Sequence, residues 1–342
     1  MTRFIEKKRR IEQCLNFYLG FQMLRFLLLI WITPLISEEP FLHNVRQLTS
    51  LAMNFEKAGE AYFSPDETLI IFQAVPIKEH DYQIYVMDLE EMIPKRVSTG
   101  FGKCTCGYFK PDGQKIIFAS SHESEASAKE NSHHDTYKWD LTPYMNIYEA
   151  NWDGSGLKRL TAGSSYHAEC AYSSDGKEIV YASNENGSMN LYVMESDGTN
   201  VRQITDGTDC YYGGPFFSPD NQKIVFRADR DKRDYLQIYV IDKDGQNEQQ
   251  ITCNDAVNWA PYWHPNGKVI AFTTSLHGHR NYEIYLINID TQVTCRLTCN
   301  ASFDGLPVFN KKGDKIMWTS KRGPENACHV FIADFILPDI LH

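Results

Sequence analysis

The chain has 342 residues, of which 42% are apolar, 23% charged and 13% aromatic, which is the composition of an ordinary globular protein. It is too apolar for a disordered chain and too polar for a protein that spans a membrane many times. The formal net charge of −10 excludes a basic surface over the whole chain, so we expect no nucleic-acid partner. Length alone allows two or three domains.

The head of the chain differs from the rest, because it is basic whereas the remainder is strongly acidic. Residues 15–36 are mostly apolar, but Arg25 would be costly inside a membrane-spanning helix. If translation begins at Met23, residues 26–36 form an apolar stretch behind a short basic segment. This pattern predicts a signal peptide or signal anchor over residues 1–37. We therefore expect a secreted, periplasmic or membrane-anchored protein, with a buried N-terminal helix as the alternative.

Nine cysteines are present, eight of them after residue 100, which is compatible with an oxidising compartment. Their spacing predicts no particular disulfide pairing, and buried free thiols are expected for most of them. Two N-x-S/T acceptor triplets begin at Asn186 and Asn300, and both agree with export.

One pattern recurs six times along the chain. It reads as a short strand, a turn, an apolar strand, a loop, an aromatic strand and a segment that ends in Leu-Thr or Ile-Thr. The turns are rich in Pro, Asp and Gly, which favour tight reversals. Successive turns are 46, 63, 45, 46 and 46 residues apart, so one repeat carries an insertion. The six turns lie at residues 64–66, 110–113, 174–176, 218–220, 264–267 and 311–313.

Four short strands in each unit of about 45 residues are typical of a β-propeller blade. The second and third strands each supply one aromatic residue per repeat, and we expect these rings to form the packing between neighbouring sheets. The second-strand rings are Phe72, Phe118, Tyr181, Phe226, Phe272 and Trp318. The third-strand rings are Tyr85, Tyr148, Tyr192, Tyr239, Tyr285 and Phe331.

The Thr-ended segments indicate how the ring closes. The first of them, residues 46–49, precedes any repeat, and the sixth repeat has none of its own. The N-terminal segment is therefore predicted to complete the last blade, which removes an exposed edge strand. The sequence thus predicts an all-β fold, a six-bladed β-propeller spanning residues 44–336 as a single domain, and we expect a monomer.

Several phrases resemble those of the TolB-like six-bladed propeller superfamily, whose repeats are of the type also found in dipeptidyl-peptidase propellers. They are Phe-Ser-Pro-Asp, Ile-Tyr-Val-Met-Asp and, above all, residues 211–220 and 258–262. The resemblance covers nearly everything after residue 44. It implies an exported propeller, and because this family mostly provides binding scaffolds, it implies a protein or peptide ligand at the channel mouth.

Strand order assigns the unusual residues to one face. The loop that enters the first strand and the loop between the second and third strands share a face. The loop that contains the insertion, residues 120–144, therefore lies on it. Inner strands line the channel, so their entry positions are predicted to rim its mouth. The candidate ligand-binding residues are His122, Trp139, His167, Glu169, Tyr212, Asn258, Trp259, His277 and Asp304.

Catalytic signatures are mostly absent, since there is no G-x-S-x-G elbow, no phosphate-binding loop and no dinucleotide motif. The sequence favours a non-catalytic scaffold without a cofactor. The alternative is a metal-assisted lyase or hydrolase on a sugar-type substrate, in which His167 and Glu169 with His122 or His277 hold a divalent metal. Arg227 interrupts an apolar strand and is expected to pair with a carboxylate.

Overall fold

The computed structural model describes residues 39–124 and 141–342, and these residues belong to one unit, Glu39–His342. The predicted export segment and Trp139 lie outside the described residues. Within the described ranges, no helix is long and apolar enough to cross a membrane. Regular helix is limited there to two short 3₁₀ turns, η1 (Leu51–Met53) and η3 (Asp339–Leu341).

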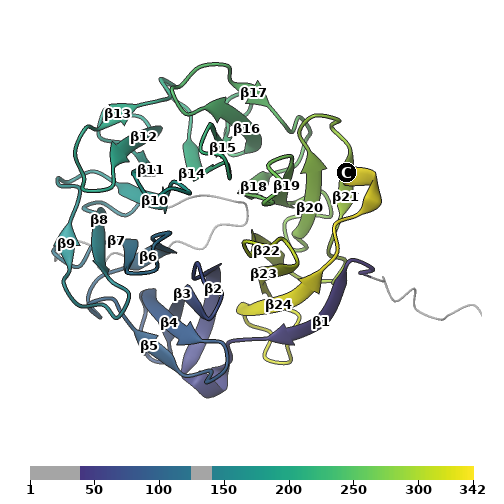
Figure 1. Cartoon of the computed structure of the whole chain (residues 1–342), viewed down its shortest axis with the longest axis horizontal. Helices are drawn as coiled ribbons and strands as arrows, with labels where there is room; N and C mark the ends of the chain where they lie inside the picture. The colour runs from purple at the N-terminus through teal and green to yellow at the C-terminus, as the bar shows by residue number, and fades with distance from the viewer. Residues whose placement is uncertain (1–38, 125–140) are drawn as a thin grey trace, which may run out of the picture. The chain divides into compact units, whose positions relative to one another are not determined.

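Six four-stranded antiparallel sheets surround a central channel, as the alternation of apolar strands and tight turns dictates (Figure 1). The innermost strands are β2 (Phe55–Phe63), β6 (Cys104–Phe109), β10 (His167–Tyr172), β14 (Tyr212–Phe217), β18 (Asn258–Trp263) and β22 (Asp304–Phe309). The second strands are β3 (Leu69–Pro76), β7 (Lys115–Ser120), β11 (Glu178–Ser183), β15 (Lys223–Ala228), β19 (Val269–Thr274) and β23 (Lys315–Ser320).

The outer half of each blade completes the sheet. The third strands are β4 (Gln83–Asp88), β8 (Asn146–Asn151), β12 (Asn190–Glu195), β16 (Gln237–Asp242), β20 (Glu283–Asn288) and β24 (His329–Phe335). The fourth strands are β5 (Pro94–Arg96), β9 (Lys158–Arg159), β13 (Arg202–Gln203), β17 (Gln249–Gln250), β21 (Thr294–Arg296) and β1 (Leu42–Gln47). Blades are numbered 1 to 6 in the order of their innermost strands.

The N-terminal strand closes the last blade, which confirms the prediction. β1 pairs antiparallel with β24, and Leu42 lies opposite Phe335 while Gln47 lies opposite Phe331. Figure 1 shows β1 along the outer side of β24. Because both ends of the ring share one sheet, the sixth blade cannot form without residues from the beginning of the propeller.

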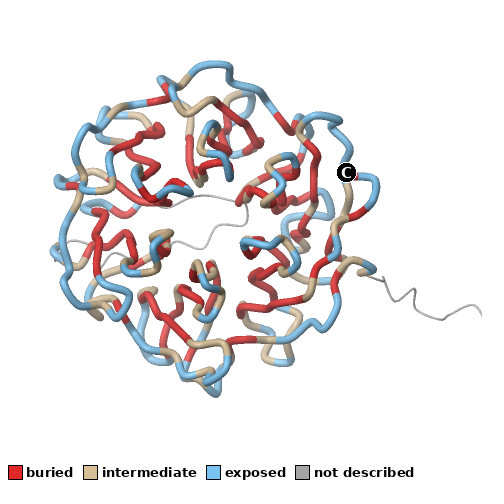
Figure 2. Tube along the Cα trace, in the orientation of Figure 1, coloured by how far each residue is buried: buried red, intermediate tan, exposed pale blue. Residues whose placement is uncertain are grey.

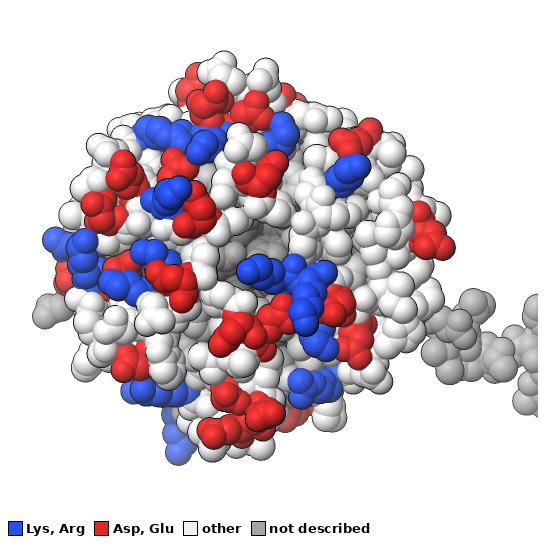
Figure 3. Space-filling view, viewed as in Figure 1, with Lys and Arg blue, Asp and Glu red and all other residues white. Residues whose placement is uncertain are grey.

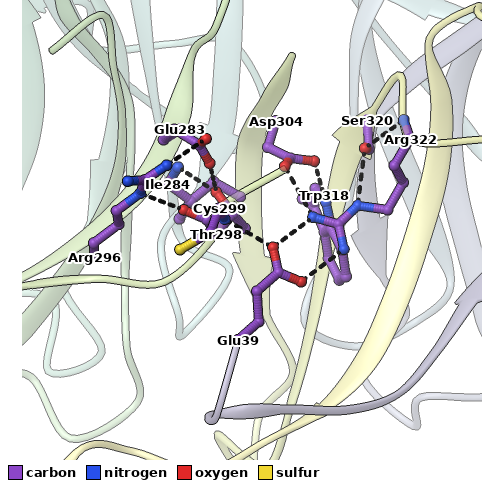
Figure 4. Close-up of polar contacts among 10 residues, drawn as sticks. All are labelled: Glu39, Glu283, Ile284, Arg296, Thr298, Cys299, Asp304, Trp318, Ser320 and Arg322. Atoms are coloured by element: carbon purple, nitrogen blue, oxygen red, sulfur yellow. Dashed lines mark hydrogen bonds and ion pairs between the residues drawn. The ribbon is translucent and has the colours of Figure 1, made fainter. Parts of the chain in front are cut away.

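A partly buried ionic cluster fixes the residue that leads into this strand (Figure 4). Glu39 accepts two hydrogen bonds from the Arg322 guanidinium, at 2.9 and 3.0 Å, and one from the backbone N–H of Cys299 at 2.8 Å. Arg322 also donates to Asp304 at 2.8 Å. Bidentate pairs of this kind are directional, so the cluster sets where the chain enters blade 6.

The two aromatic columns meet as cross-strand pairs. In every blade the second-strand ring lies directly opposite the third-strand ring, with centroids 5.6 to 6.2 Å apart. The pairs are Phe72–Tyr85, Phe118–Tyr148, Tyr181–Tyr192, Phe226–Tyr239, Phe272–Tyr285 and Trp318–Phe331. Directly opposite aromatic side chains stabilise antiparallel sheets.

Each aromatic pair also packs on the aliphatic face of the preceding blade, as the sequence predicts. The Phe118–Tyr148 pair of blade 2 shares a buried cluster with Ile71 and Ile84 of blade 1. Clusters of the same kind occur around the ring. Figure 2 shows the buried residues concentrated in the sheets and the exposed ones in the turns and outer strands. The core is therefore a set of interblade layers surrounding the channel.

The Leu-Thr and Ile-Thr endings have a hydrogen-bonding role. The Thr205 hydroxyl accepts the backbone N–H of Leu191 at 2.9 Å and donates to the Asn190 side chain at 2.9 Å. Hydroxyls at the equivalent position of the other blades accept the equivalent backbone N–H. A buried N–H without a partner is costly, so the recurrent Thr satisfies a donor that the short fourth strand leaves open.

Candidate functional site

Every innermost strand contains a β-bulge at the same place, where it gains one residue relative to the second strand. The bulge residue has a φ between 47° and 57° in all six strands. These residues line the channel on the side where the innermost strands begin, which we call the entry face. They are Glu60, Cys106, Glu169, Gly214, Ala260 and Leu306.

A buried ion pair occupies one side of this channel wall. Arg227 of β15 donates from Nη2 to Oε2 of Glu169 at 3.0 Å, and both side chains are about 5% exposed. Oε1 of Glu169 accepts hydrogen bonds from Tyr211 at 2.5 Å and Tyr166 at 3.2 Å, and the backbone N–H of Gly214 donates to Oε2. With four donors around it, Glu169 is a fully hydrogen-bonded carboxylate. The expected pairing of Arg227 with a carboxylate is confirmed.

Gly214 lies so close to this pair that no side chain fits there. A Cβ at this position would meet the guanidinium of Arg227, and the φ of 56° also favours glycine. The backbone of β14 therefore approaches the pair directly, which is why its N–H can reach Glu169.

Glu60 is the second carboxylate of the channel. Burial raises its pKa to about 7, and the charge of Glu169 adds to the increase. Tyr62 donates to Oε1 of Glu60 over a long 3.4 Å contact. Glu60 thus exchanges a proton near neutral pH, whereas Glu169 is held by its ion pair. Two carboxylates with different hydrogen-bond partners share one small cavity.

Aromatic rings close the middle of the channel. Tyr62, Tyr108, Phe216 and Tyr262 come from four different innermost strands and form a continuous network with centroids 4.9 to 6.1 Å apart. The hydroxyls of Tyr108 and Tyr262 lie 3.3 Å apart. We call these four rings the aromatic septum. It separates the entry-face cavity, which contains Glu60 and Glu169, from a cavity on the opposite side.

The side of the Pro-Asp turns, called here the turn face, has the larger cavity, of about 410 Å³. Its walls include Pro65, Pro111, Pro219 and Pro265, and its floor is the septum. Figure 3 shows a hollow in the middle of one face, with charged side chains around it. The sequence assigned only tight hairpins to the turn face, so this cavity is a feature that sequence reasoning missed. The repeated prolines, which project from every regular turn, were the available signal.

The predicted entry positions require a correction. They were expected to rim the channel mouth, but all six side chains are less than 5% exposed and pack inside the blades. The bulge explains the difference, because the residue that reaches the channel lies two positions further along each strand. The buried entry residues are Ala58, Cys104, His167, Tyr212, Asn258 and Asp304.

Each of these buried polar residues has a local structural role. Burial lowers the pKa of His167 to about 4, so its imidazole is neutral, and its ring lies 6.2 Å from Tyr181. Asn258 donates to Gln237 at 2.8 Å, and Asp304 accepts from Arg322 and from Trp318. Tyr212 stacks on Phe226 at 5.9 Å.

Of the other candidate residues, Glu169 and Trp259 line the entry-face cavity together. Trp259 is partly exposed and lies 6.3 Å from the ring of Phe303. Nδ1 of His122 and the hydroxyl of Ser120 share a hydrogen bond of 2.8 Å. His277 is exposed and lies 2.9 Å from the hydroxyl of Tyr285. The structure thus places only two of the described candidates in the channel.

Within residues 39–124 and 141–342, no three His, Cys, Asp or Glu side chains are grouped to hold a metal ion. Among residues of these types that line the entry-face cavity, the bulge residues are Glu60, Cys106 and Glu169. Glu169 already receives the cationic Arg227 and a backbone N–H, and burial raises the pKa of the Cys106 thiol well above its usual range. These three residues do not fit a divalent cation.

Comparison with known families agrees with the fold. The TolB beta propeller domain model matches residues 140–252 and 185–278. The propeller is TolB-like. This confirms the resemblance seen in the turn and strand phrases of the sequence. No curated protein sequence matches the chain.

Solved structures with the same fold share little sequence with this TolB-like chain. A protein described as a TolB from Agrobacterium tumefaciens superposes with a TM-score of 0.59 at 20% identity, over 82% of this chain and 91% of that one. TolB from Acinetobacter baumannii gives 0.56 at 19% identity, over 82% of this chain and 64% of its own. Oligogalacturonate lyase from Vibrio parahaemolyticus gives 0.54 at 14%, over 87% and 94%. At these identities the likeness concerns the fold alone.

Proposed function

We propose that this TolB-like propeller is an exported, non-catalytic scaffold that binds a protein or peptide segment at the entry-face mouth of its channel. The observation that carries the proposal is the composition of this mouth. Trp259, a large and partly exposed ring, lines the same cavity as Glu60 and the Glu169–Arg227 pair. Tryptophan and arginine beside a carboxylate in a concave site are the side chains that contribute most to protein interfaces.

The rigidity of the wall supports a binding role. Glu169, Arg227 and Tyr211 fix one another through hydrogen bonds of 2.5 to 3.0 Å, and Gly214 brings the backbone against them. A preorganised polar wall lowers the ordering cost of association. It also presents charge in a fixed direction, which favours specificity more than affinity.

Catalysis by a metal-assisted lyase finds no support in the described channel. The carboxylate that such a site would use as a ligand, Glu169, already pairs with Arg227. Glu60 exchanges a proton near pH 7, but burial raises the pKa of the neighbouring Cys106 thiol and Tyr62 phenol well above their usual ranges, so neither complements it as an acid or base at this pH. The proposal includes export. Its support is the basic and apolar head, residues 1–37, together with the TolB-like fold.

A peptide-display selection on the full chain tests this proposal. Peptides that bind the parent protein are counter-screened against Trp259→Ala and against Trp152→Ala. Trp152 is a matched control, since it is 44% exposed in the turn between β8 and β9, away from the channel. We expect enriched peptides to lose at least tenfold in affinity for Trp259→Ala and to keep their affinity for Trp152→Ala. Equal binding to both variants would remove the proposal.

A further inference from the structure

The cavity on the turn face has the size of a small-molecule site. Its volume of about 410 Å³ falls within the range of roughly 300 to 1,000 Å³ that is typical of ligand pockets. It is separated from the proposed peptide site by the aromatic septum, so the two cavities can be occupied independently. An inference about its ligand goes beyond the function proposed above.

Aromatic rings and prolines make up much of the lining of this cavity, and serine and asparagine side chains add polar surface. Phe216 and Tyr262 meet edge to face in its floor, with centroids 5.0 Å apart, and Phe63, Phe217 and Phe309 contribute to its walls. Ring systems prefer edge-to-face and offset contacts with further rings, so such walls favour a flat aromatic ligand over a bulky aliphatic one. Lys311, an exposed residue, is the one charged side chain on the described lining, and the interior therefore favours an uncharged ring.

One polar feature lies in the apolar floor. The hydroxyls of Tyr108 and Tyr262 are 3.3 Å apart, and their mutual hydrogen bond uses one of the two protons. The pair consequently retains a second proton to donate and lone pairs to accept. Burial raises the pKa of both phenols, so both remain protonated at neutral pH. A ligand that carries one hydroxyl or N–H group can complete this hydrogen-bonding pair.

We propose that the turn-face cavity is a binding site for a small uncharged aromatic molecule that bears a hydroxyl or an N–H group, of the phenol or indole type. The ring lies against Phe216 and Tyr262, and its polar group exchanges hydrogen bonds with the Tyr108–Tyr262 pair. The prolines of the regular turns, such as Pro65 and Pro219, cover its edges.

Ligand-observed NMR on the full chain, with p-cresol, indole and toluene as probes, tests the proposal. We expect saturable binding of p-cresol and indole, with toluene about five- to tenfold weaker because it lacks the polar group. Tyr108→Phe combined with Tyr262→Phe removes both hydroxyls and should bring p-cresol close to toluene while leaving toluene unchanged. The melting temperature of each variant reports whether it is folded.

A blocking variant locates the binding. Ser174 is an exposed residue on the cavity lining, at a turn position where four other blades have proline, and Ser174→Trp should abolish binding of all three probes. Gln246→Trp, in an exposed outer turn of the same face, is the matched control and should bind like the parent. Absence of saturable binding, binding that survives Ser174→Trp, or equal affinity for p-cresol and toluene would each overturn the proposal. Peptide binding at Trp259 should be unaffected, which separates this test from that of the proposed function.

Discussion

Glu169 and Arg227 form an ion pair of 3.0 Å between the innermost strand of blade 3 and the second strand of blade 4, so the pair joins two sheets across their interface. Removing one partner leaves a buried charge without its counterion. We expect Arg227→Met to lower the free energy of unfolding by about 3 to 5 kcal/mol. Denaturant unfolding measures this value.

The double variant shows whether the loss comes from the pair. Glu169→Gln with Arg227→Met should cost clearly less than the sum of the single changes, since neither charge then stays buried alone. Additive losses would mean that the two residues stabilise the blades separately.

Glu283 makes stability depend on pH. Burial raises its pKa to about 7, against the hydrogen bonds from Thr298 and Arg296. The folded protein therefore retains a proton that the unfolded chain releases, and the free energy of unfolding falls as pH rises from about 4.5 to 7. Glu283→Gln should remove this contribution, on the order of 2 to 3 kcal/mol. Melting temperatures at pH 5 and pH 8 test it, and an unchanged difference between the two would contradict the assignment.

His167 makes stability depend on pH in the direction opposite to that of Glu283. Its pKa of about 4 in the folded protein lies below the ordinary value of 6.5, because burial disfavours the imidazolium. Stability is therefore lost as pH falls from about 6.5 to 4. His167→Phe, which has an aromatic ring of similar shape, should lose less stability over this interval than the parent chain. Comparing the variant with the parent at each pH cancels the contribution of Glu283. A parallel pair of pH curves would disprove the role of His167.

The anchoring of the closing strand is testable through Glu39. Glu39→Gln removes the ionic component of its bonds to Arg322 but leaves the Arg322–Asp304 pair in place. We expect a loss of about 1 to 2 kcal/mol and faster amide exchange that is confined to β1 and β24. Amides of β11 and β12 serve as the internal control. Uniformly faster exchange in all blades would show that Glu39 affects the whole ring and not its closure.

The Thr hydroxyls predict a fifth stability effect. Thr205→Val keeps the volume but deprives the Leu191 N–H and the Asn190 side chain of a partner. The expected loss is about 1 to 3 kcal/mol. Thr208→Val, at an exposed loop position, is the control and should change stability little. A similar loss in both variants would mean that the hydroxyl of Thr205 has no special role.

The architecture of this protein was predictable because its repeats are encoded locally. Pro and Gly specify each turn, and the aromatic residues of the second and third strands occur in register, as in Phe72 and Tyr85. The closing strand followed from counting, since the segment before Thr49 had no blade of its own. Such features depend on residues that are close in sequence or on the repeat itself. Each of these can be recognised from the sequence alone.

The channel lining was not predictable in the same way. Strand alternation places Asp304 or Asn258 at the channel, but the bulge shifts the exposed position by two residues. Five of the six bulge residues are not glycine, so no residue type marks the left-handed backbone there. The hydrogen-bond pairing with the second strand imposes it, as at Leu306. The septum was missed for a related reason, because rings such as Tyr62 and Phe216 meet only across the channel.

The repeated bulge has a consequence for how this channel can change over evolution. Five of the six bulge sites carry a side chain at the channel, whether it is that of Glu60, Cys106 or Ala260, because pairing within each sheet and not side-chain identity sets their position. At Glu60, Cys106, Ala260 and Leu306, which take no part in the Glu169–Arg227 pair, a substitution changes the lining of the channel and leaves the interblade layers in place. The fold therefore separates most of the channel lining from the residues that keep the protein folded.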